Sequence, residues 1–288
     1  MVLVEPIQQT RHKGDEVMES GYYEWGNRNN PTLVFLHGMG SAGLSFGELA
    51  KLTMSNYHII AFDLPGHGGK APLPNEEDYL PTSIAENLSK LIESLGLTDV
   101  ILVGHSWGAH LALYLAGLYP KMVKGLILLD GGYFQQDPVG DSLAKQLENV
   151  DVFTEKVRYP SWEAFLESEK VDSPTWSKEI EAGRLAQVTE IDGEIRLAIS
   201  PFTAKAVIKG IYQDQTAIMF PKVLSPVLLM RSTLPTEVED DRRTAIEYFV
   251  EKIPQAEVQA IPNTSHDIYR DAPEIISWKI NEWIKRKL

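Results

Sequence analysis

The chain has 288 residues, of which 43% are hydrophobic, so it is long enough for one large domain with a sizeable buried core. Its formal net charge of −13 at pH 7 disfavours nucleic acid and anionic membranes as partners, because both are negatively charged. The chain contains no cysteine, which excludes disulfides, thiolate zinc sites and a cysteine nucleophile.

The start of the chain and its hydropathy indicate where the protein works. Residues 1–6 lack the basic flank and the long apolar stretch of a signal peptide. The sequence has no run of 18 apolar residues of the kind that crosses a membrane. We therefore expect a cytoplasmic protein with neither a membrane nor a nucleic-acid partner. The sequence leaves the oligomeric state open.

Short apolar strands alternate with helices over the first 132 residues. Residues 17–19 and 22–25 predict an antiparallel hairpin at the edge of a sheet. Apolar runs rich in β-branched residues then predict strands, and apolar positions at helical spacing predict helices. The predicted strands are 32–36, 57–62, 100–103 and 123–129, and the predicted helices are 44–54, 81–95 and one that ends before Pro120.

The alternation stops after residue 132. Residues 133–215 have a mostly helical pattern, and prolines divide them into about four short helices. This segment is acidic and rich in large aromatic side chains, among them Trp162 and Trp176. We interpret it as an insertion that forms a helical cap.

The strand–helix pattern resumes over residues 216–288. Strands are predicted at 227–230 and 257–261, and helices at 240–252 and 273–287. The sequence therefore predicts an α/β core made of residues 1–132 and 216–288. The helical cap is inserted after the sixth strand of this core.

A nucleophile motif follows the predicted strand 100–103. The segment Gly104-His105-Ser106-Trp107-Gly108 matches the pattern G-x-S-x-G between a strand and a helix. Glycines two residues before and after the serine let strand and helix pass closely, so the Ser106 hydroxyl projects above the edge of the sheet. The pentapeptide alone fits an ordinary tight turn equally well, and the flanking strand and helix favour a catalytic serine.

Three further segments accompany this motif in a fixed order: His37-Gly38-Met39-Gly40, Asp63-Leu64-Pro65-Gly66-His67-Gly68 and the late His266. Together the four segments resemble the α/β-hydrolase superfamily over essentially the whole chain, in particular its serine hydrolase or esterase branch with a helical cap. The resemblance implies the α/β-hydrolase fold, a mostly parallel sheet flanked by helices. It implies no metal and no organic cofactor.

The base and the oxyanion hole are the next parts of the expected site. His266 follows the last predicted strand, so we expect it at the carboxyl edge of the sheet beside Ser106. The oxyanion of an acyl-transfer intermediate needs two backbone N–H donors, and Trp107 supplies one directly after the nucleophile. Relatives use the residue after His-Gly for the other, which here is Met39. We interpret residues 63–69 as a structural loop that braces the site.

The acid departs from the common pattern of the superfamily. Many relatives carry an aspartate after the seventh strand, where this chain has Pro235. Glu237 lies two residues further on, past the proline. Asp130 instead ends the strand next to the nucleophile strand, a location that some members use for their acid. We favour Asp130 as the third member of the triad and keep Glu237 as the alternative.

These residues predict a serine hydrolase that cleaves a small carboxylic ester through an acyl-enzyme. Serine at position 106 disfavours the dehalogenase and epoxide-hydrolase branches, which use an aspartate nucleophile. Trp162 and Trp176 are candidate contacts to an apolar part of the substrate. The same site serves lactonases, carbon–carbon hydrolases, proline aminopeptidases and perhydrolases, and some relatives are small-molecule receptors, so the fold does not choose among them.

Overall fold

A computed structural model of the chain describes residues 21–135, 143–171, 173 and 175–288. The predicted strand at residues 17–19 lies outside the described residues. In the described part of the chain, seven strands form a central sheet in the order β1-β3-β2-β4-β5-β9-β10. These strands are β1 (Tyr22–Trp25), β2 (Thr32–Leu36), β3 (His58–Phe62), β4 (Val100–His105), β5 (Val123–Leu129), β9 (Val227–Arg231) and β10 (Ala256–Ala260).

The central sheet is mostly parallel, as predicted. Only β1 runs antiparallel to its neighbour, β3, and the other neighbouring pairs are parallel. The chain passes from β2 to β3 on one side and then to β4 on the other side of β2, so the strand order reverses there. Open α/β sheets hold their ligands at the carboxyl ends of the strands beside such a reversal.

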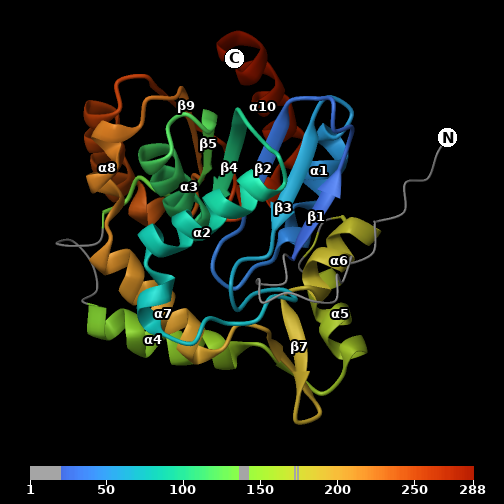
Figure 1. The fold of residues 1–288 in the computed structure, drawn as a ribbon. Helices are drawn as coiled ribbons and strands as arrows, with labels where there is room; N and C mark the ends of the chain where they lie inside the picture. The colour runs from blue at the N-terminus through green and yellow to red at the C-terminus, as the bar shows by residue number, and fades with distance from the viewer. Residues whose placement is uncertain (1–20, 136–142, 172, 174) are drawn as a thin grey trace.

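Helices cover both faces of the sheet (Figure 1), which explains why its central strands are continuous apolar runs. Val34 and Leu102 point into one apolar cluster, and their neighbours Phe35 and Val103 point into the other. The first cluster is covered by α2 (Pro81–Ser94), α3 (Trp107–Leu118) and α8 (Glu239–Lys252), and the second by α1 (Gly47–Thr53), α9 (Ile268–Asp271) and α10 (Pro273–Lys287). Short 3-10 helices lie at η1 (Gly43–Phe46), η2 (Glu76–Tyr79), η3 (Thr216–Ile218), η4 (Phe220–Lys222) and η5 (Thr236–Val238).

The segment between β5 and β9 leaves the central sheet. Among its described residues it forms the helices α4 (Leu143–Lys156), α5 (Trp162–Val171), α6 (Lys178–Leu185) and α7 (Pro201–Gln213). It also forms a small antiparallel sheet of β6 (Arg158–Tyr159), β8 (Glu194–Leu197) and β7 (Val188–Ile191). Phe165 and Ile195 belong to an apolar cluster that is separate from the two clusters of the core. Figure 1 shows these elements grouped beyond one end of the central strands.

One expectation about this segment needs correction. The sequence predicted the helices but missed the small sheet, although Asp192-Gly193 between β7 and β8 is a strong hairpin signal and both residues have positive φ. Five described strands of the central sheet precede the segment, and the sixth strand of the predicted count, at residues 17–19, lies outside the described residues.

Hydrogen bonds join the two ends of this segment to each other. The Thr216 hydroxyl donates to the Gly132 carbonyl oxygen at 3.0 Å and accepts from the Gln135 amide at 3.2 Å. The backbone N–H of Ala217 donates to the side-chain oxygen of Gln135 at 3.1 Å. The chain therefore leaves and re-enters the core at one place.

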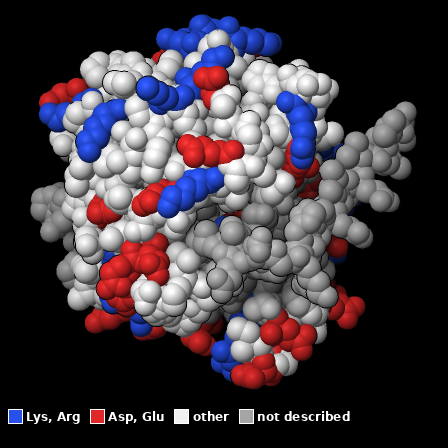
Figure 2. All heavy atoms as spheres, viewed as in Figure 1, with Lys and Arg blue, Asp and Glu red and all other residues white. Residues whose placement is uncertain are grey.

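The surface charge is uneven on the face shown in Figure 2. Acidic side chains gather over the lower part, where the β7–β8 hairpin lies, and basic side chains gather at the end of α10, which carries Lys285, Arg286 and Lys287. None of the helices in the described ranges is both long and apolar enough to span a bilayer.

Candidate active site

Ser106 occupies a strained turn between β4 and α3. Its φ of 52° and ψ of −116° lie in a region that L residues rarely adopt, and its N–H donates to the Leu129 carbonyl of β5 at 3.2 Å. Gly104 and Gly108, on either side of the serine, let neighbouring backbone segments approach each other closely. A Cβ at Gly108 would lie 2.0 Å from the Leu36 carbonyl oxygen, and one at Gly104 would lie 2.4 Å from the Gly108 oxygen. The chain thus forms the sharp strand–turn–helix predicted for the G-x-S-x-G motif.

His266 and Asp130 are brought together from opposite sides of the insertion in sequence. Nδ1 of His266 lies 2.8 Å from Oδ2 of Asp130. A carboxylate only accepts hydrogen bonds, so Nδ1 carries the proton, and the neutral ring has its lone pair on Nε2. Asp130 is 7% exposed, whereas the His266 side chain is 58% exposed. The pair therefore has one buried end that orients the ring and one accessible end.

His105, the residue before Ser106, supports His266 from below. Its Nε2 lies 3.0 Å from the His266 carbonyl oxygen, and the two rings pack with centroids 4.8 Å apart. Burial, followed by the nearby charge of His266, lowers the pKa of His105 to about 4. His105 is thus a neutral donor at neutral pH. The sequence analysis placed His105 inside the elbow but did not predict this contact.

The charges around the pair shift both of its pKa values. Burial opposes ionisation of Asp130, but the hydrogen bond and charge of His266 and the donors of Ser232 outweigh it, so the pKa of Asp130 is lowered. Burial likewise disfavours the charged form of His266, but the hydrogen bond and charge of Asp130 and the charge of Asp267 outweigh it. The pKa of His266 is therefore raised above its ordinary value of 6.5.

Asp130 is held by donors that the sequence analysis missed. The backbone N–H of Ser232 donates to Oδ1 at 2.8 Å, and the Ser232 hydroxyl donates to Oδ2 at 2.9 Å. The Tyr133 hydroxyl donates to Oδ1 at 3.3 Å. Asp130 is the first residue after β5, and Ser232 is the first after the neighbouring strand β9. The contact between Asp130 and Ser232 could have been predicted from the sequence, because each residue directly follows one of two neighbouring parallel strands.

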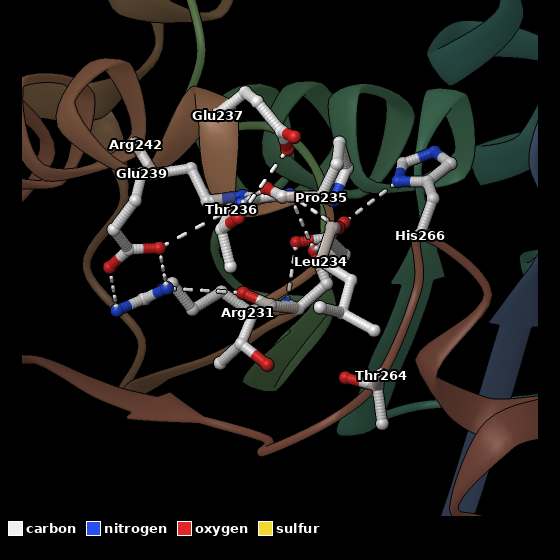
Figure 3. A network of polar contacts seen from close by, with 12 residues as sticks. Arg231, Leu234, Pro235, Thr236, Glu237, Glu239, Arg242, Thr264 and His266 are labelled. Carbon is white, nitrogen blue, oxygen red and sulfur yellow. Dashed lines mark hydrogen bonds and ion pairs between the residues drawn. The ribbon is translucent and has the colours of Figure 1, made fainter.

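Glu237, the alternative acid, lies elsewhere. It is an exposed residue of η5, and its carboxylate accepts a 3.4 Å hydrogen bond from the Thr236 hydroxyl. Figure 3 shows Glu237 and His266 separated. The hydrogen bond of His266 goes to Oδ2 of Asp130 instead. The structure therefore pairs His266 with Asp130 and not with Glu237.

The loop after β2 lies against the elbow. A Cβ at Gly38 would be 3.0 Å from Cβ of Ser106. His37 fixes this loop, because its Nε2 accepts the Leu64 N–H at 3.0 Å and its Nδ1 can therefore donate to the Gly38 carbonyl at 2.8 Å. Burial lowers the pKa of His37 to about 4, which keeps the ring neutral. The loop that carries Met39 is thus held rigidly next to Ser106.

The second predicted oxyanion donor is Trp107. It is the first residue of α3, so its own helix offers no carbonyl to accept its N–H. The segment 63–69 braces this region, since the carboxylate of Asp63 accepts from the N–H groups of Gly43 and Gly69 at 2.8 and 3.1 Å. The Asp63 carboxylate also accepts a hydrogen bond from the Tyr23 hydroxyl at 3.1 Å.

The aromatic side chains of the insertion take different positions. Trp176 donates from Nε1 to Glu181 at 2.9 Å and lies under the Lys170 ammonium, so its contacts are within the insertion. Trp162 begins α5 and is 38% exposed. Phe153 of α4 reaches the core, because a Cβ at Gly40 would lie 2.7 Å from its ring. The sequence analysis did not single out Phe153.

Within the described ranges, no group of three or more histidine or carboxylate side chains is arranged to hold a metal ion. The groups gathered here are a serine in a strained turn, a histidine–aspartate pair, the loop that carries Met39 and the first backbone N–H of α3. These groups can activate a hydroxyl nucleophile and stabilise an oxyanion.

Comparison with known proteins places the chain in one family. The family model described as "Alpha/beta hydrolase family" matches residues 33–277. The sn-1-specific diacylglycerol lipase ABHD11 of Mus musculus is 26% identical over 261 residues, which cover 86% of this chain and 79% of the lipase.

Solved structures show the same fold. The structure of E-2-(acetamidomethylene)succinate hydrolase superimposes with a TM-score of 0.73 and 22% identity, covering 92% of this chain and 94% of that one. A marine microorganism esterase gives a TM-score of 0.71 and 22% identity, covering 92% and 99%. The mostly parallel sheet and these matches agree, and the chain belongs to the alpha/beta hydrolase family, whose matched relatives here are hydrolases.

Proposed function

We propose that this protein is a serine hydrolase that cleaves a small carboxylic ester through an acyl-enzyme. The observation that carries the proposal is the 2.8 Å His266–Asp130 pair at the same sheet edge as the strained Ser106 turn. Such a turn stores backbone strain, which persists mainly where a function needs it. The lipase among the relatives supports an ester substrate.

The first half of the proposed reaction forms the acyl-enzyme. Oγ of Ser106 attacks the ester carbonyl carbon while its proton passes to Nε2 of His266. Asp130 holds Nδ1 and stabilises the imidazolium that forms. The carbonyl oxygen becomes an oxyanion that accepts hydrogen bonds from the N–H groups of Met39 and Trp107. The intermediate then expels the alcohol, which takes the proton from His266.

The second half regenerates the serine. A water molecule attacks the acyl carbon as His266 removes its proton, and a second oxyanion forms in the same place. This intermediate breaks the bond to Oγ of Ser106, which recovers the proton from His266, and the carboxylic acid leaves. The chemistry uses side chains and backbone amides only, so it calls for no cofactor.

We further propose that residues 133–215 form a cap domain over a core made of residues 1–132 and 216–288. The contact of Phe153 with the loop at Gly40 supports this division, because it brings the insertion to the proposed oxyanion hole. Trp162 and Trp176 remain predicted substrate contacts, and we propose Phe153 as a third, because its ring lies near Gly40. An aromatic lining favours an apolar acyl or alcohol group in the substrate.

A fluorophosphonate probe tests the nucleophile. The protein should be labelled once, on the peptide that contains Ser106, and Ser106→Ala should abolish labelling without changing the melting curve. Ser94→Ala, on the exposed end of α2, serves as the matched control and should be labelled normally. Labelling that survives Ser106→Ala would overturn the assignment.

Turnover of a short-chain aryl ester separates the enzyme from a receptor on the same fold. Steady release of the chromophore over many equivalents is expected for the hydrolase. Release of a single slow equivalent would instead indicate a signalling protein whose acyl-enzyme is not hydrolysed. A panel of esters and lactones with varied acyl length then defines the substrate class.

A further inference from the structure

A buried arginine lies next to the residues that hold Asp130. Arg242, near the start of α8, is only 4% exposed, and its side chain reaches the loop after β9 (Figure 3). Its Nη2 donates to the Ser232 hydroxyl at 3.2 Å and to the Leu234 carbonyl at 2.7 Å, and its Nη1 donates to the Pro235 carbonyl at 2.8 Å. A buried guanidinium is costly to desolvate, and here the carboxylate of Glu239, 3.7 Å from Nη1, and these three oxygen acceptors offset that cost.

The donor and acceptor roles in this cluster are fixed by chemistry. A guanidinium has no acceptor, so Oγ of Ser232 must accept from Arg242 and has one proton to give. The Leu234 carbonyl lies 3.4 Å from that hydroxyl and already accepts from Arg242, whereas Oδ2 of Asp130 lies at 2.9 Å. The hydroxyl proton therefore points to the same carboxylate oxygen that faces His266.

We propose that Arg242 and Ser232 are positioning residues for the triad: Arg242 fixes the Ser232 hydroxyl as a donor, and that donor fixes the carboxylate of Asp130 against His266. The inference rests on the proposed function. Neither side chain touches the reacting atoms. Together with the backbone N–H of Ser232, they hold both oxygens of the Asp130 carboxylate.

This arrangement, in which Arg242 and Ser232 hold Asp130, is called the relay below. It also affects the pKa of the proposed base, His266. The charged and titratable groups around His266 are Asp130 after β5, His105 at the end of β4, the neighbouring Asp267, and Arg242 of α8. Asp130 and Asp267 raise the pKa of His266, whereas burial and the charge of Arg242 lower it. Arg242 therefore keeps a larger share of the His266 ring neutral, and able to accept a proton, near pH 7.

Three variants test the relay against a matched control. Ser232→Ala removes the hydroxyl but leaves the Arg242 contacts to the carbonyls, and we expect kcat to fall by about tenfold with little change in KM. Arg242→Lys keeps the charge but loses the fork of donors, so kcat should fall by several-fold with an unchanged pH midpoint. Arg242→Gln should lower kcat and also move the midpoint of kcat/KM up, by on the order of half a pH unit. Arg243→Gln, the exposed neighbour on α8, should change neither quantity.

Titration of the His266 ring by NMR gives a readout that needs no substrate. Ser232→Ala removes a donor dipole and Arg242→Gln removes a charge, so in both variants the ring should titrate at higher pH than in the wild type. A merely structural role would lower the melting temperature without moving this titration. If Arg242→Gln does not fold, Ser232→Ala and Arg242→Lys decide the question.

The outcomes separate the relay from the proposed function. A wild type that fails to turn over any ester while its His266 titration responds as expected overturns the ester hydrolase and keeps the relay. A wild type that turns over, with kcat of Ser232→Ala and Arg242→Lys within twofold of it and with the His266 titration unchanged in Ser232→Ala, overturns the relay and keeps the hydrolase.

Discussion

The catalytic edge of the sheet and the insertion beside it are stabilised in different ways. At the edge, Asp130, Ser232 and His266 lie within a few residues of strand ends, and buried hydrogen bonds connect them. The insertion has a small apolar cluster and also ion pairs at the surface, such as Lys205 with Asp151. Surface pairs contribute roughly 0–1 kcal/mol, whereas a buried network loses much more when one member is removed.

This difference indicates how the two regions respond to substitution. A single change at the edge leaves a buried polar atom without its partner and moves the reacting groups. We expect a change in the insertion to alter the proposed apolar contacts to the substrate and to leave the proposed triad in place. We therefore expect the edge to set the rate and the insertion to set selectivity, and the following predictions test that division.

The largest effect is expected at the acid. Asp130→Asn should lower kcat by about 10⁴-fold, because the amide no longer holds the His266 ring in the right tautomer. Glu237→Gln is the matched control and should cost less than about tenfold, or roughly 1.4 kcal/mol. Glu237→Gln should keep the wild-type melting curve, whereas Asp130→Asn changes a member of the buried network and should lower the melting temperature. The reverse ranking of the two kcat values would place the acid in the loop after β9.

A smaller effect, on stability alone, is expected inside the insertion. Phe165 is buried in the insertion cluster, so Phe165→Ala should destabilise that region by about 3–5 kcal/mol. The variant should melt at a lower temperature but rank a panel of esters as the wild type does. A changed ranking at unchanged melting temperature would show that Phe165 acts on the substrate.

Selectivity should change at the aromatic side chain that reaches the core. We expect Phe153→Ala to change the ratio of kcat/KM between a long-chain and a short-chain ester by about tenfold, since a few methylene contacts are worth roughly 1–3 kcal/mol. Trp162→Ala and Trp176→Ala test the substrate contacts predicted from the sequence by the same ratio. Equal ratios in all three variants and the wild type would contradict a role of the insertion in selectivity.

The smallest expected effect is the position of the pH profile. The pKa of His266 is raised above 6.5, mainly by Asp130 against the opposing effect of burial, so the base loses its proton at a higher pH than an isolated imidazole. The rate constant kcat/KM should therefore rise with pH, with a midpoint above 6.5. A flat profile from pH 5 to pH 8 would argue against a histidine base.

The core and the positions of Ser106 and Asp130 at the ends of strands could be predicted from the sequence, because local sequence signals mark both. The strands before Ser106 and Asp130 are unbroken apolar runs, and the glycines around Ser106 mark the turn. The choice of Asp130 over Glu237 followed from which strands are neighbours. Glu237 is near the usual acid position in sequence, but the η5 turn directs it to Thr236.

The parts that could not be predicted depend on tertiary contacts. Ser232 and Arg242 meet only because the loop after β9 folds back onto α8, and neither residue has a local signature. The contact of Phe153 with Gly40 joins residues that are more than a hundred positions apart. The strand β6 is only two residues long, too short for a periodic pattern to show.

The hydrogen-bonded closure between Gly132 and Thr216 makes the insertion an exchangeable module. Since the chain departs and returns at one point, we expect an insertion of another length, grafted there, to leave in place the strands that precede Ser106, Asp130 and His266. The core, which carries the proposed reaction chemistry, and the insertion, which we expect to set substrate choice, can then change independently within one gene. A chimera with the insertion of a relative should keep the nucleophile reactive to fluorophosphonate and adopt the ester ranking of the donor.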